Sequence, residues 1–283
     1  MSRIAFVNGR YVPFTEAMVH IEDRGLQFAD AIYEVFAVRD GRLLDAEGHW
    51  KRLERSLGEL RQGVPMAMVS LAGHVAETVR RNRVRNGLAY LQVTRGVAKR
   101  DHPFPPAGLP QTVIITARRI DRAKADAAAE AGIAVITAPD QRWARCDIKT
   151  TALIANVLAK QAAREAGAYE AWLVDNDGLV TEGSSSNAWI VTADGVLVTR
   201  SLSHAILPGI TRASVLQLAS ARQLKVEERA FTPAEARAAR EAFITSAGSF
   251  VLPVVRIDGQ AIGEGRPGPI TQALRADYLT PAL

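Results

Sequence analysis

Four stretches of the sequence carry reactive or polar side chains that a folding pattern alone does not require. They are "RCDIKT" (145–150), "TEGSSSN" (181–187), "LPGITR" (207–212) and "TRGVAKRDHPF" (94–104). The first places a lysine before the apolar stretch "ALIANVLAK", and the second places an acid before three serines. In the third, a proline and a glycine introduce a helix whose free N–H groups can bind an anion. The fourth sets an arginine and a histidine two residues apart in a loop, which is one way to bind a carboxylate.

Each stretch has a simpler interpretation when it is taken alone. Lys149 can begin a helix and reach water, "TEGSSSN" can be a turn, and a loop with Arg100 and His102 can be solvated. Together they supply an amine for an aldehyde, a carboxylate for a ring nitrogen, an anion site and basic groups for a substrate. A lysine Schiff base with an acidic partner to a pyridinium nitrogen is the signature of pyridoxal phosphate chemistry. We therefore predict pyridoxal 5'-phosphate as the cofactor, and expect the apolar stretch after Lys149 to favour the neutral, nucleophilic amine.

The elements that must position these residues mix strands with helices. Asn8-Gly9 and Asp40-Gly41 separate apolar runs, which predicts two β-hairpins. Helical spacing of apolar residues predicts helices in "AEGHWKRLERSLGEL", "PMAMVSLAGHVAETVRRN" and "GITRASVLQLASARQ", and another from about Thr151 to Ala166. Strands are expected in "LAYLQVTRG", "TVIITA", "IAVITA" and "NAWIVTADGVLVT".

The fold class predicted from this pattern is α+β with two domains, because hairpins join most of the strands. Residues 1–117 are expected to form a smaller N-terminal domain, and residues 118–126 ("RRIDRAKAD") a charged linker. Residues 127–283 are expected to form a larger C-terminal domain that carries Lys149.

Composition narrows the class of protein. Apolar residues make up 48% and charged residues 23% of the 283 residues, as in ordinary globular proteins. The net charge of +5 has its densest cluster, "RRNRVR" (80–85), at the end of a predicted helix, so we expect no nucleic-acid partner. No apolar run reaches the ~20 residues that cross a bilayer, and the start "MSRIAFVNGR" has no secretory pattern. With one cysteine and no thiolate metal motif, we expect a cytoplasmic protein without a metal or a membrane partner.

The sequence resembles the class IV aminotransferases, the fold-type IV pyridoxal-phosphate enzymes, and among them it is most similar to the bacterial D-amino-acid (D-alanine) aminotransferases. The motifs that carry the resemblance are "EDRGLQFADAIYEV", "QVTRG", "RCDIK", "LAKQAAREAGAYEA", "TEGSSSN" and "LPGITR", in the order of the family and over nearly the whole chain. It implies the two-domain fold of that family. It also implies transamination between D-amino acids, such as D-alanine and D-glutamate, and 2-oxo acids by a ping-pong mechanism.

The resemblance also implies roles for single residues. Lys149 would form the Schiff base and carry the proton between the substrate and the cofactor, and Glu182 would pair with the ring nitrogen. The residues implied at the cofactor phosphate are Arg52, Ile210, Thr211, Ser246 and Ala247. Leu207 would pack on the ring, with Ser185 and Ser186 close to the ring and the substrate.

The same resemblance places the substrate α-carboxylate at Tyr33, Arg100 and His102, which favours D-amino acids. In the family the loop with the arginine and the histidine reaches the neighbouring subunit's site, so a homodimer is implied. Ala37 departs from the pattern, because D-specific members commonly carry a lysine there.

Other activities on the same fold remain as alternatives. The chain could be a branched-chain L-amino-acid aminotransferase, an (R)-amine aminotransferase or an aminodeoxychorismate lyase. Arg100 and His102 argue against these, because the pair has no obvious role where no carboxylate lies on that side. A non-enzymatic binding protein would leave Lys149, Glu182 and the "LPGITR" helix start without a common purpose.

Overall fold

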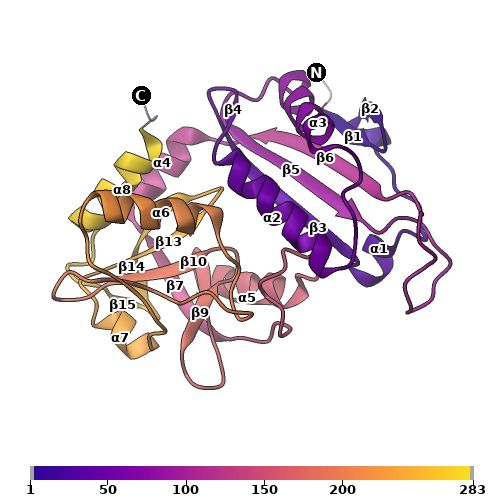
Figure 1. Cartoon of the computed structure of the whole chain (residues 1–283). Helices are drawn as coiled ribbons and strands as arrows, with labels where there is room; N and C mark the ends of the chain where they lie inside the picture. The colour runs from indigo at the N-terminus through magenta and orange to yellow at the C-terminus, as the bar shows by residue number, and fades with distance from the viewer. Residues whose placement is uncertain (1–2, 281–283) are drawn as a thin grey trace. The chain divides into compact units, whose positions relative to one another are not determined.

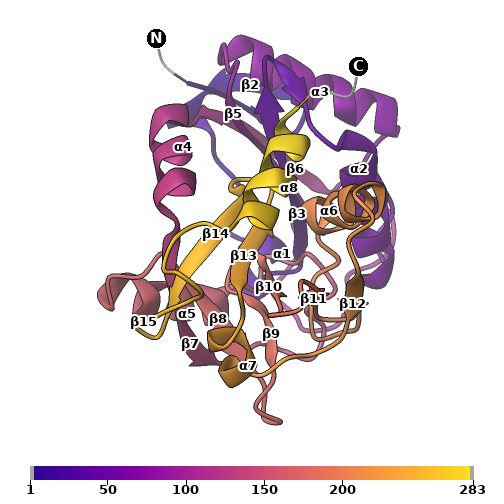
Figure 2. The same cartoon turned by 90° about the vertical axis from the view of Figure 1, so that its left-hand side faces the viewer.

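The computed structural model describes residues 3–280, and their contacts divide into two compact units. The first unit contains the residues up to Asp121 together with Ile148–Ala152. The second contains Arg122–Asp147 and the residues from Leu153 onward. Figures 1 and 2 label the elements of both units.

The first unit is a six-stranded antiparallel sheet with helices packed on it. Its elements are β1 (Ile4–Val7), β2 (Arg10–Pro13), a 3-10 turn (Phe14–Glu16), α1 (Arg24–Phe28), β3 (Ala31–Arg39), β4 (Arg42–Leu43), α2 (Ala46–Glu59), α3 (Met68–Arg81), β5 (Gly87–Thr94) and β6 (Thr112–Arg119). The strand order is β2-β1-β6-β5-β3-β4. Helices α2 and α3 bury leucines and valines against β3, β5 and β6, which forms the core of this unit (Figure 1).

The two predicted hairpins of the first unit are confirmed. Asn8 and Gly9 have φ values of 47° and 88° between β1 and β2. Asp40 and Gly41 have φ values of 49° and 81° between β3 and β4. Positive φ at both central residues is what a two-residue type I′ turn requires, which is why Asn-Gly and Asp-Gly mark such turns in a sequence.

The second unit contains a nine-stranded mixed sheet. Its elements are α4 (Arg122–Ala131), β7 (Ile133–Pro139), α5 (Ile154–Glu165), β8 (Glu170–Val174), β9 (Val180–Gly183), β10 (Asn187–Val191), β11 (Leu197–Thr199), α6 (Ile210–Ala221), β12 (Val226–Glu228), α7 (Pro233–Arg237), β13 (Glu241–Ser246), β14 (Phe250–Ile257), β15 (Gln260–Ala261) and α8 (Pro269–Leu279). The strand order is β12-β11-β10-β13-β14-β7-β8-β9, with β15 on β14.

Both faces of this second sheet are covered. Along β10, Ala188 and Ile190 face one apolar cluster, whereas Trp189 and Val191 face another, as the two-residue period of a strand requires. The second cluster lies under α6 and α8, which pack together on β13 and β14 (Figures 1 and 2). The central strands are therefore largely apolar on both sides, and buried carboxylates such as Glu170 and Glu182 stand out among them.

The structure differs from the sequence predictions in two respects. Residues 118–126, expected to be a linker, contain the end of β6 and the first five residues of α4. Lys149, expected in the C-terminal domain, packs with the first unit. The linker was predicted from the charges of residues 118–126. Exposed arginines at a strand end and on a short alanine-rich helix are, however, compatible with regular structure.

Candidate active site

The edge of β3 holds the lysine segment in place. β4 pairs only with the last two residues of β3, so the first part of that edge is left for another segment. Residues 148–151 occupy it: Tyr33 N donates to the carbonyl of Lys149 at 2.9 Å, and Thr151 N donates to the carbonyl of Ala31 at 3.1 Å. Lys149 therefore lies beside the edge of β3, next to an isolated bridge between Ile32 and Thr150, and the predicted helix begins later, at Ile154.

The amine of Lys149 lies over an aromatic ring. Its Nζ is 4.3 Å from the centroid of the Tyr33 ring, and no ion pair joins it to a carboxylate in the part of the chain that the structure describes. We expected the helix after Lys149 to give its amine apolar surroundings. This prediction is wrong, because Ile154, Val157 and Leu158 on that helix are 73%, 56% and 59% exposed. The support comes from β3 and from buried Ile148 instead.

Arg52 lies on α2 and is bound by a carboxylate that the sequence analysis did not single out. Its Nε and Nη2 donate to the two oxygens of Glu34 at 2.8 and 2.7 Å, and His49 Nδ1 lies 2.7 Å from the same carboxylate. Glu34 is fully buried on β3. Burial raises the pKa of Glu34, but the charge and hydrogen bonds of Arg52 and the hydrogen bond of His49 lower it to about 2.

Arg100 and His102 are exposed on a loop that is fixed at its base. The guanidinium of Arg100 lies 5.2 Å from the centre of the Phe28 ring, and the His102 ring is 5.6 Å from it. Buried Arg24 donates to the carbonyls of Asp101, His102 and Pro103. The contacts of the pair are therefore with Phe28, whereas the ring of Tyr33 stacks on Tyr90.

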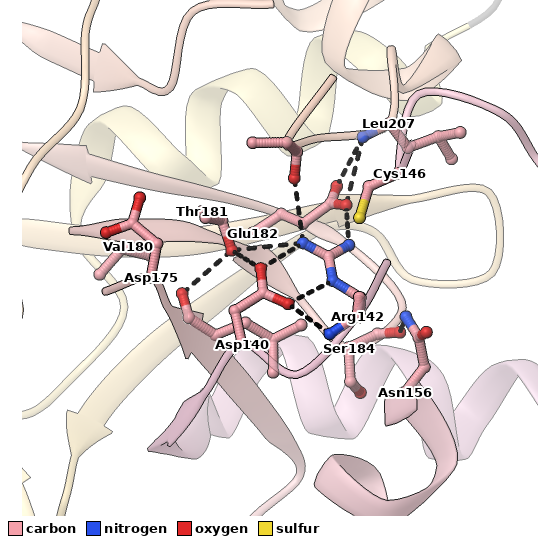
Figure 3. Close-up of polar contacts among 12 residues, drawn as sticks. Asp140, Arg142, Cys146, Asn156, Asp175, Val180, Thr181, Glu182, Ser184 and Leu207 are labelled. Atoms are coloured by element: carbon pink, nitrogen blue, oxygen red, sulfur yellow. Dashed lines mark hydrogen bonds and ion pairs between the residues drawn. The ribbon is translucent and has the colours of Figure 1, made fainter. Parts of the chain in front are cut away.

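Glu182, in β9, is held by donors from three segments, two of which are labelled in Figure 3 by Arg142 and Leu207. Arg142 Nη1 donates to Oε1, and Asn187 Nδ2 donates to Oε2 at 3.0 Å. The backbone N–H of Leu207 lies 3.2 Å from both oxygens. On its other side Arg142 donates to Asp140 at 2.7 and 2.9 Å, so one guanidinium bridges two carboxylates.

Helix α6 begins next to this carboxylate. Asn187 donates from the same amide to the carbonyl of Leu207 at 3.0 Å, which ties Glu182 to the segment that leads into the helix. Gly209 precedes α6 and offers no side-chain cap, so the first N–H groups, at Ile210 and Thr211, have no intrahelical partner. A Cβ at Gly209 would lie 1.9 Å from Asn187 Oδ1, so any larger residue there would have to displace the Asn187 amide.

The three serines of "TEGSSSN" share one acceptor. The hydroxyls of Ser184, Ser185 and Ser186 all donate to Glu170, at 2.8 Å for Ser185 and 3.2 Å for Ser186. Glu170 begins β8, is fully buried, and also lies 3.3 Å from the Lys160 amine. The buried carboxylate therefore fixes the loop that contains the two predicted substrate- and ring-contacting serines.

Ser246 and Ala247 lie at the turn between β13 and β14. Ser246 Oγ accepts from the backbone N–H of Ser249 at 3.1 Å, which closes the turn. The strand that ends at Ser246 neighbours β10, the strand that begins with Asn187. Within the second unit the structure thus groups Glu182, Leu207 and the start of α6 by direct contacts, and it places this turn on an adjacent strand.

Cys146 does not have the properties of a nucleophile. Its Sγ lies 3.1 Å from the carbonyl of Trp143. Burial raises the pKa of the thiol, and this outweighs the lowering effect of Arg142, so the pKa is about 11. The thiol therefore stays protonated at neutral pH, as expected of a structural cysteine.

Several polar residues of the site were missed by sequence reasoning. Arg142 and Asp140 lie outside the quoted motifs, and Glu34 and Glu170 lie inside two of them without having been singled out. A lone charge in a strand or loop gives no sign of burial. The one usable signal was the Asp140–Arg142 spacing just before "RCDIKT", since an acid and a base two residues apart can pair.

The residues of the second unit fit pyridoxal phosphate. The cofactor needs an anionic acceptor for its ring nitrogen and donors for its phosphate, and this unit contains an ion-paired carboxylate and an uncapped helix start. Among residues 3–280, no group of three His, Cys, Asp or Glu side chains could ligate a metal ion. None of the described helices is long and apolar enough to cross a membrane.

Comparisons with known proteins agree with this chemistry. The chain is 44% identical to the D-alanine aminotransferase of Bacillus licheniformis over 94% of this chain and 92% of that protein. The corresponding enzyme of Staphylococcus haemolyticus is 37% identical over 96% and 95%. The branched-chain amino acid aminotransferase of Escherichia coli has the same fold, with a TM-score of 0.90 at 25% identity over 98% of this chain and 94% of that one. The T.th. branched-chain amino acid aminotransferase with pyridoxamine 5'-phosphate gives a TM-score of 0.88 at 30% identity over 99% and 93%.

The sequence also matches a protein-family model. The model of amino-transferase class IV matches residues 31–257, a range that includes Lys149, Glu182 and the start of α6. The chain therefore belongs to the class IV aminotransferase family.

Proposed function

We propose that this enzyme transfers amino groups between D-amino acids, such as D-alanine and D-glutamate, and 2-oxo acids by a ping-pong mechanism, with pyridoxal 5'-phosphate as cofactor. The observation that carries the proposal is the 44% identity to a D-alanine aminotransferase over nearly the whole of both chains. The branched-chain aminotransferases share the fold but are 25–30% identical in the comparisons above. Because one fold serves several substrates, sequence identity is the better guide to the substrate here.

The family resemblance suggests which residues would hold the cofactor. Lys149 would bind the cofactor aldehyde through its amine, and Glu182 would accept the hydrogen bond of the protonated ring nitrogen. Arg52, the N–H groups of Ile210 and Thr211, and the turn of Ser246 and Ala247 would bind the phosphate. Leu207 would pack on the ring, with Ser186 nearby. Bound in this way, the cofactor supplies an aldehyde that takes up the amino group and a ring that withdraws electrons.

The chain's own residues would move one proton. The Lys149 amine would take the proton from the substrate Cα and return it on the cofactor side, which requires the amine to be neutral. The centroid of the Tyr33 ring lies 4.3 Å from Nζ, so the ring forms an aromatic wall beside the amine. Ser185 would contact the substrate, and Glu170 fixes its hydroxyl.

The substrate carboxylate would bind to Tyr33, Arg100 and His102. Arg100 and His102 are exposed, and buried Arg24 holds the backbone of their loop, so the two side chains are presented on a fixed support. We propose a homodimer in which this loop serves the neighbouring subunit. The exposed apolar face of α5, formed by Ile154, Val157 and Leu158, supports an assembly of two copies. A single cysteine is consistent with the proposed cytoplasmic location.

One experiment tests cofactor attachment and another tests the substrate. Borohydride treatment of the holoenzyme, followed by peptide mass spectrometry, is expected to place the reduced cofactor on Lys149; a label on another lysine would contradict the role of Lys149. With a 2-oxo acid as acceptor, the enzyme is expected to consume D-alanine faster than L-leucine. Preference for L-leucine would instead support the branched-chain alternative.

A further inference from the structure

Arg142 uses almost every donor of its guanidinium on the acidic cluster around Glu182. Besides the bond to Glu182, Nε and Nη2 donate to Asp140, and Nη2 also contacts the carbonyl of Ala205 at 3.0 Å and Thr181 Oγ1 at 3.3 Å (Figure 3). The side chain is only 6% exposed. An arginine buried this completely is held in one orientation.

The charges of the cluster have a defined balance. Asp140 and Glu182 are anionic and Arg142 is cationic, so the three together carry one negative charge. Burial alone would lower the pKa of Arg142, but the hydrogen bond to Asp140 and the charges of Glu182 and Asp140 raise it above its ordinary value. For Asp140 the effects are reversed: burial alone would raise its pKa, but the hydrogen bond and charge of Arg142 hold that pKa below its ordinary range. Arg142 therefore keeps its charge, and so does the carboxylate behind it.

Three donors to Glu182 come from different segments: Arg142 from the loop after β7, Asn187 from β10 and Leu207 from the approach to α6. Of these three, Arg142 is the charged one. Without it, Asp140 and Glu182 would be two buried carboxylates with no shared cation, and burial favours protonation of one of them. A protonated Glu182 would no longer favour a protonated ring nitrogen.

We propose that Arg142 is a positioning residue that keeps Glu182 ionised and oriented toward the cofactor ring nitrogen, while Asp140 offsets the positive charge that Arg142 would otherwise present to that ring. The proposal rests on the proposed role of Glu182. Arg142 acts through Glu182, with which it forms an ion pair. An anionic partner is needed because a protonated ring nitrogen makes the ring a stronger electron acceptor.

The test compares four holoenzymes with wild type, using pyridoxal phosphate labelled with ¹⁵N in the ring. The chemical shift of that nitrogen reports its protonation, which a loss of packing alone would not change. Arg142→Met removes the cation, Arg142→Lys retains a cation but cannot bridge both carboxylates as a guanidinium does, and Glu182→Gln is the reference for loss of the anion. Arg200→Met is the matched control, since Arg200 forms a 2.9 Å ion pair with Asp175 and contacts the carbonyl of Val180 without touching Glu182.

The proposal predicts that Arg142→Met moves the ring nitrogen signal toward neutral pyridine, in the direction of Glu182→Gln, and weakens cofactor binding at least about tenfold. Arg142→Lys should recover part of both effects, and Arg200→Met should match wild type. If Glu182→Gln moves the signal and a folded Arg142→Met does not, the role of Arg142 is wrong while that of Glu182 stands. If neither moves it, both roles fail.

Asp140→Asn keeps the proposal testable should Arg142→Met not fold. It leaves Arg142 in place but raises the charge of the cluster by one, so the ring nitrogen signal should again move toward neutral pyridine. An unchanged signal in this variant would contradict the charge balance that the proposal requires. Thermal unfolding of each apo-protein identifies variants that have lost the fold.

Discussion

Glu34, Glu170 and Glu182 are buried carboxylates, and the structure balances each in a different way. Glu34 receives a bidentate arginine and a histidine. Glu170 receives three serine hydroxyls and lies near an amine. Glu182 receives one arginine together with an amide and a backbone N–H. A buried charge is tolerated only with such partners, and each of the three clusters contains at least one residue proposed to act on cofactor or substrate.

Glu34 gives a prediction about pH. Its pKa is lowered to about 2 from an ordinary 4.5, so its ionised form stabilises the fold above about pH 4.5, and this stabilisation is lost as the pH falls toward 2. The contribution is on the order of 3 kcal/mol. We expect Glu34→Gln to lower the free energy of unfolding near pH 7 by a few kcal/mol and to flatten its decline in acid. Urea unfolding from pH 7 to pH 2.5 measures both effects.

The control for this prediction is Glu47→Gln. Glu47 pairs with Lys51 at 2.6 Å on the exposed side of α2, so its loss should leave the unfolding curves unchanged. If Glu34→Gln follows the wild-type dependence on pH, the buried ion pair contributes no net stability and the argument fails.

Arg100 gives a prediction about substrate binding. Arg100→Ala should raise the KM for amino acids by about tenfold to a hundredfold, the effect of losing one charged hydrogen bond, and leave cofactor binding unchanged. Lys99→Ala is the matched control, because Lys99 is the neighbouring exposed cation with no predicted role. Steady-state kinetics and cofactor titration measure the two effects; an unchanged KM would place the carboxylate elsewhere.

At the scale of elements, the start of α6 links two parts of the candidate site. Gly209 packs against the Asn187 amide, whose nitrogen bonds to both Glu182 and Leu207. Because Gly209 has an ordinary negative φ of −64°, glycine is required there for space and not for backbone freedom.

Gly209→Ala should therefore displace Asn187 and weaken cofactor binding by about tenfold or more, since two hydrogen bonds of a buried amide are disturbed. Gly73→Ala is the control: Gly73 lies within α3 with open space around it, and alanine should stabilise that helix by about 0.5–1 kcal/mol. Fluorescence titration with pyridoxal phosphate and thermal unfolding measure these outcomes. Unchanged cofactor binding in Gly209→Ala would show that Asn187 can move without cost.

The elements also show what a sequence can reveal. The Asn8-Gly9 and Asp40-Gly41 hairpins were predictable because the turn type demands those residues. The setting of Lys149 was not, because it depends on β4 being two residues long and leaving part of the β3 edge open. The pairing of Arg142 with Glu182 joins residues 40 positions apart, and local patterns carry no information about such contacts.

At the scale of the whole molecule, the proposed dimer makes a prediction about α5. Val157, 56% exposed, lies between Ile154 and Leu158 on one helix face. Val157→Glu should raise the dimer dissociation constant by about tenfold or more, because a charge would be placed in an apolar contact. Val69→Glu is the matched control, since Val69 is a valine that is 81% exposed on another helix, α3. Sedimentation velocity over a concentration series measures both; a dimer unaffected by Val157→Glu would exclude this face.

The most direct test of the proposed activity is a single half-reaction. The holoenzyme is mixed with D-alanine or L-alanine, without an acceptor, and the visible absorption of the bound cofactor is followed in a stopped-flow instrument. We predict that D-alanine removes the visible band at least about a hundredfold faster than L-alanine, as expected where a site is built to bind one arrangement of polar groups. Faster loss of the band with L-alanine would contradict the D-amino-acid assignment.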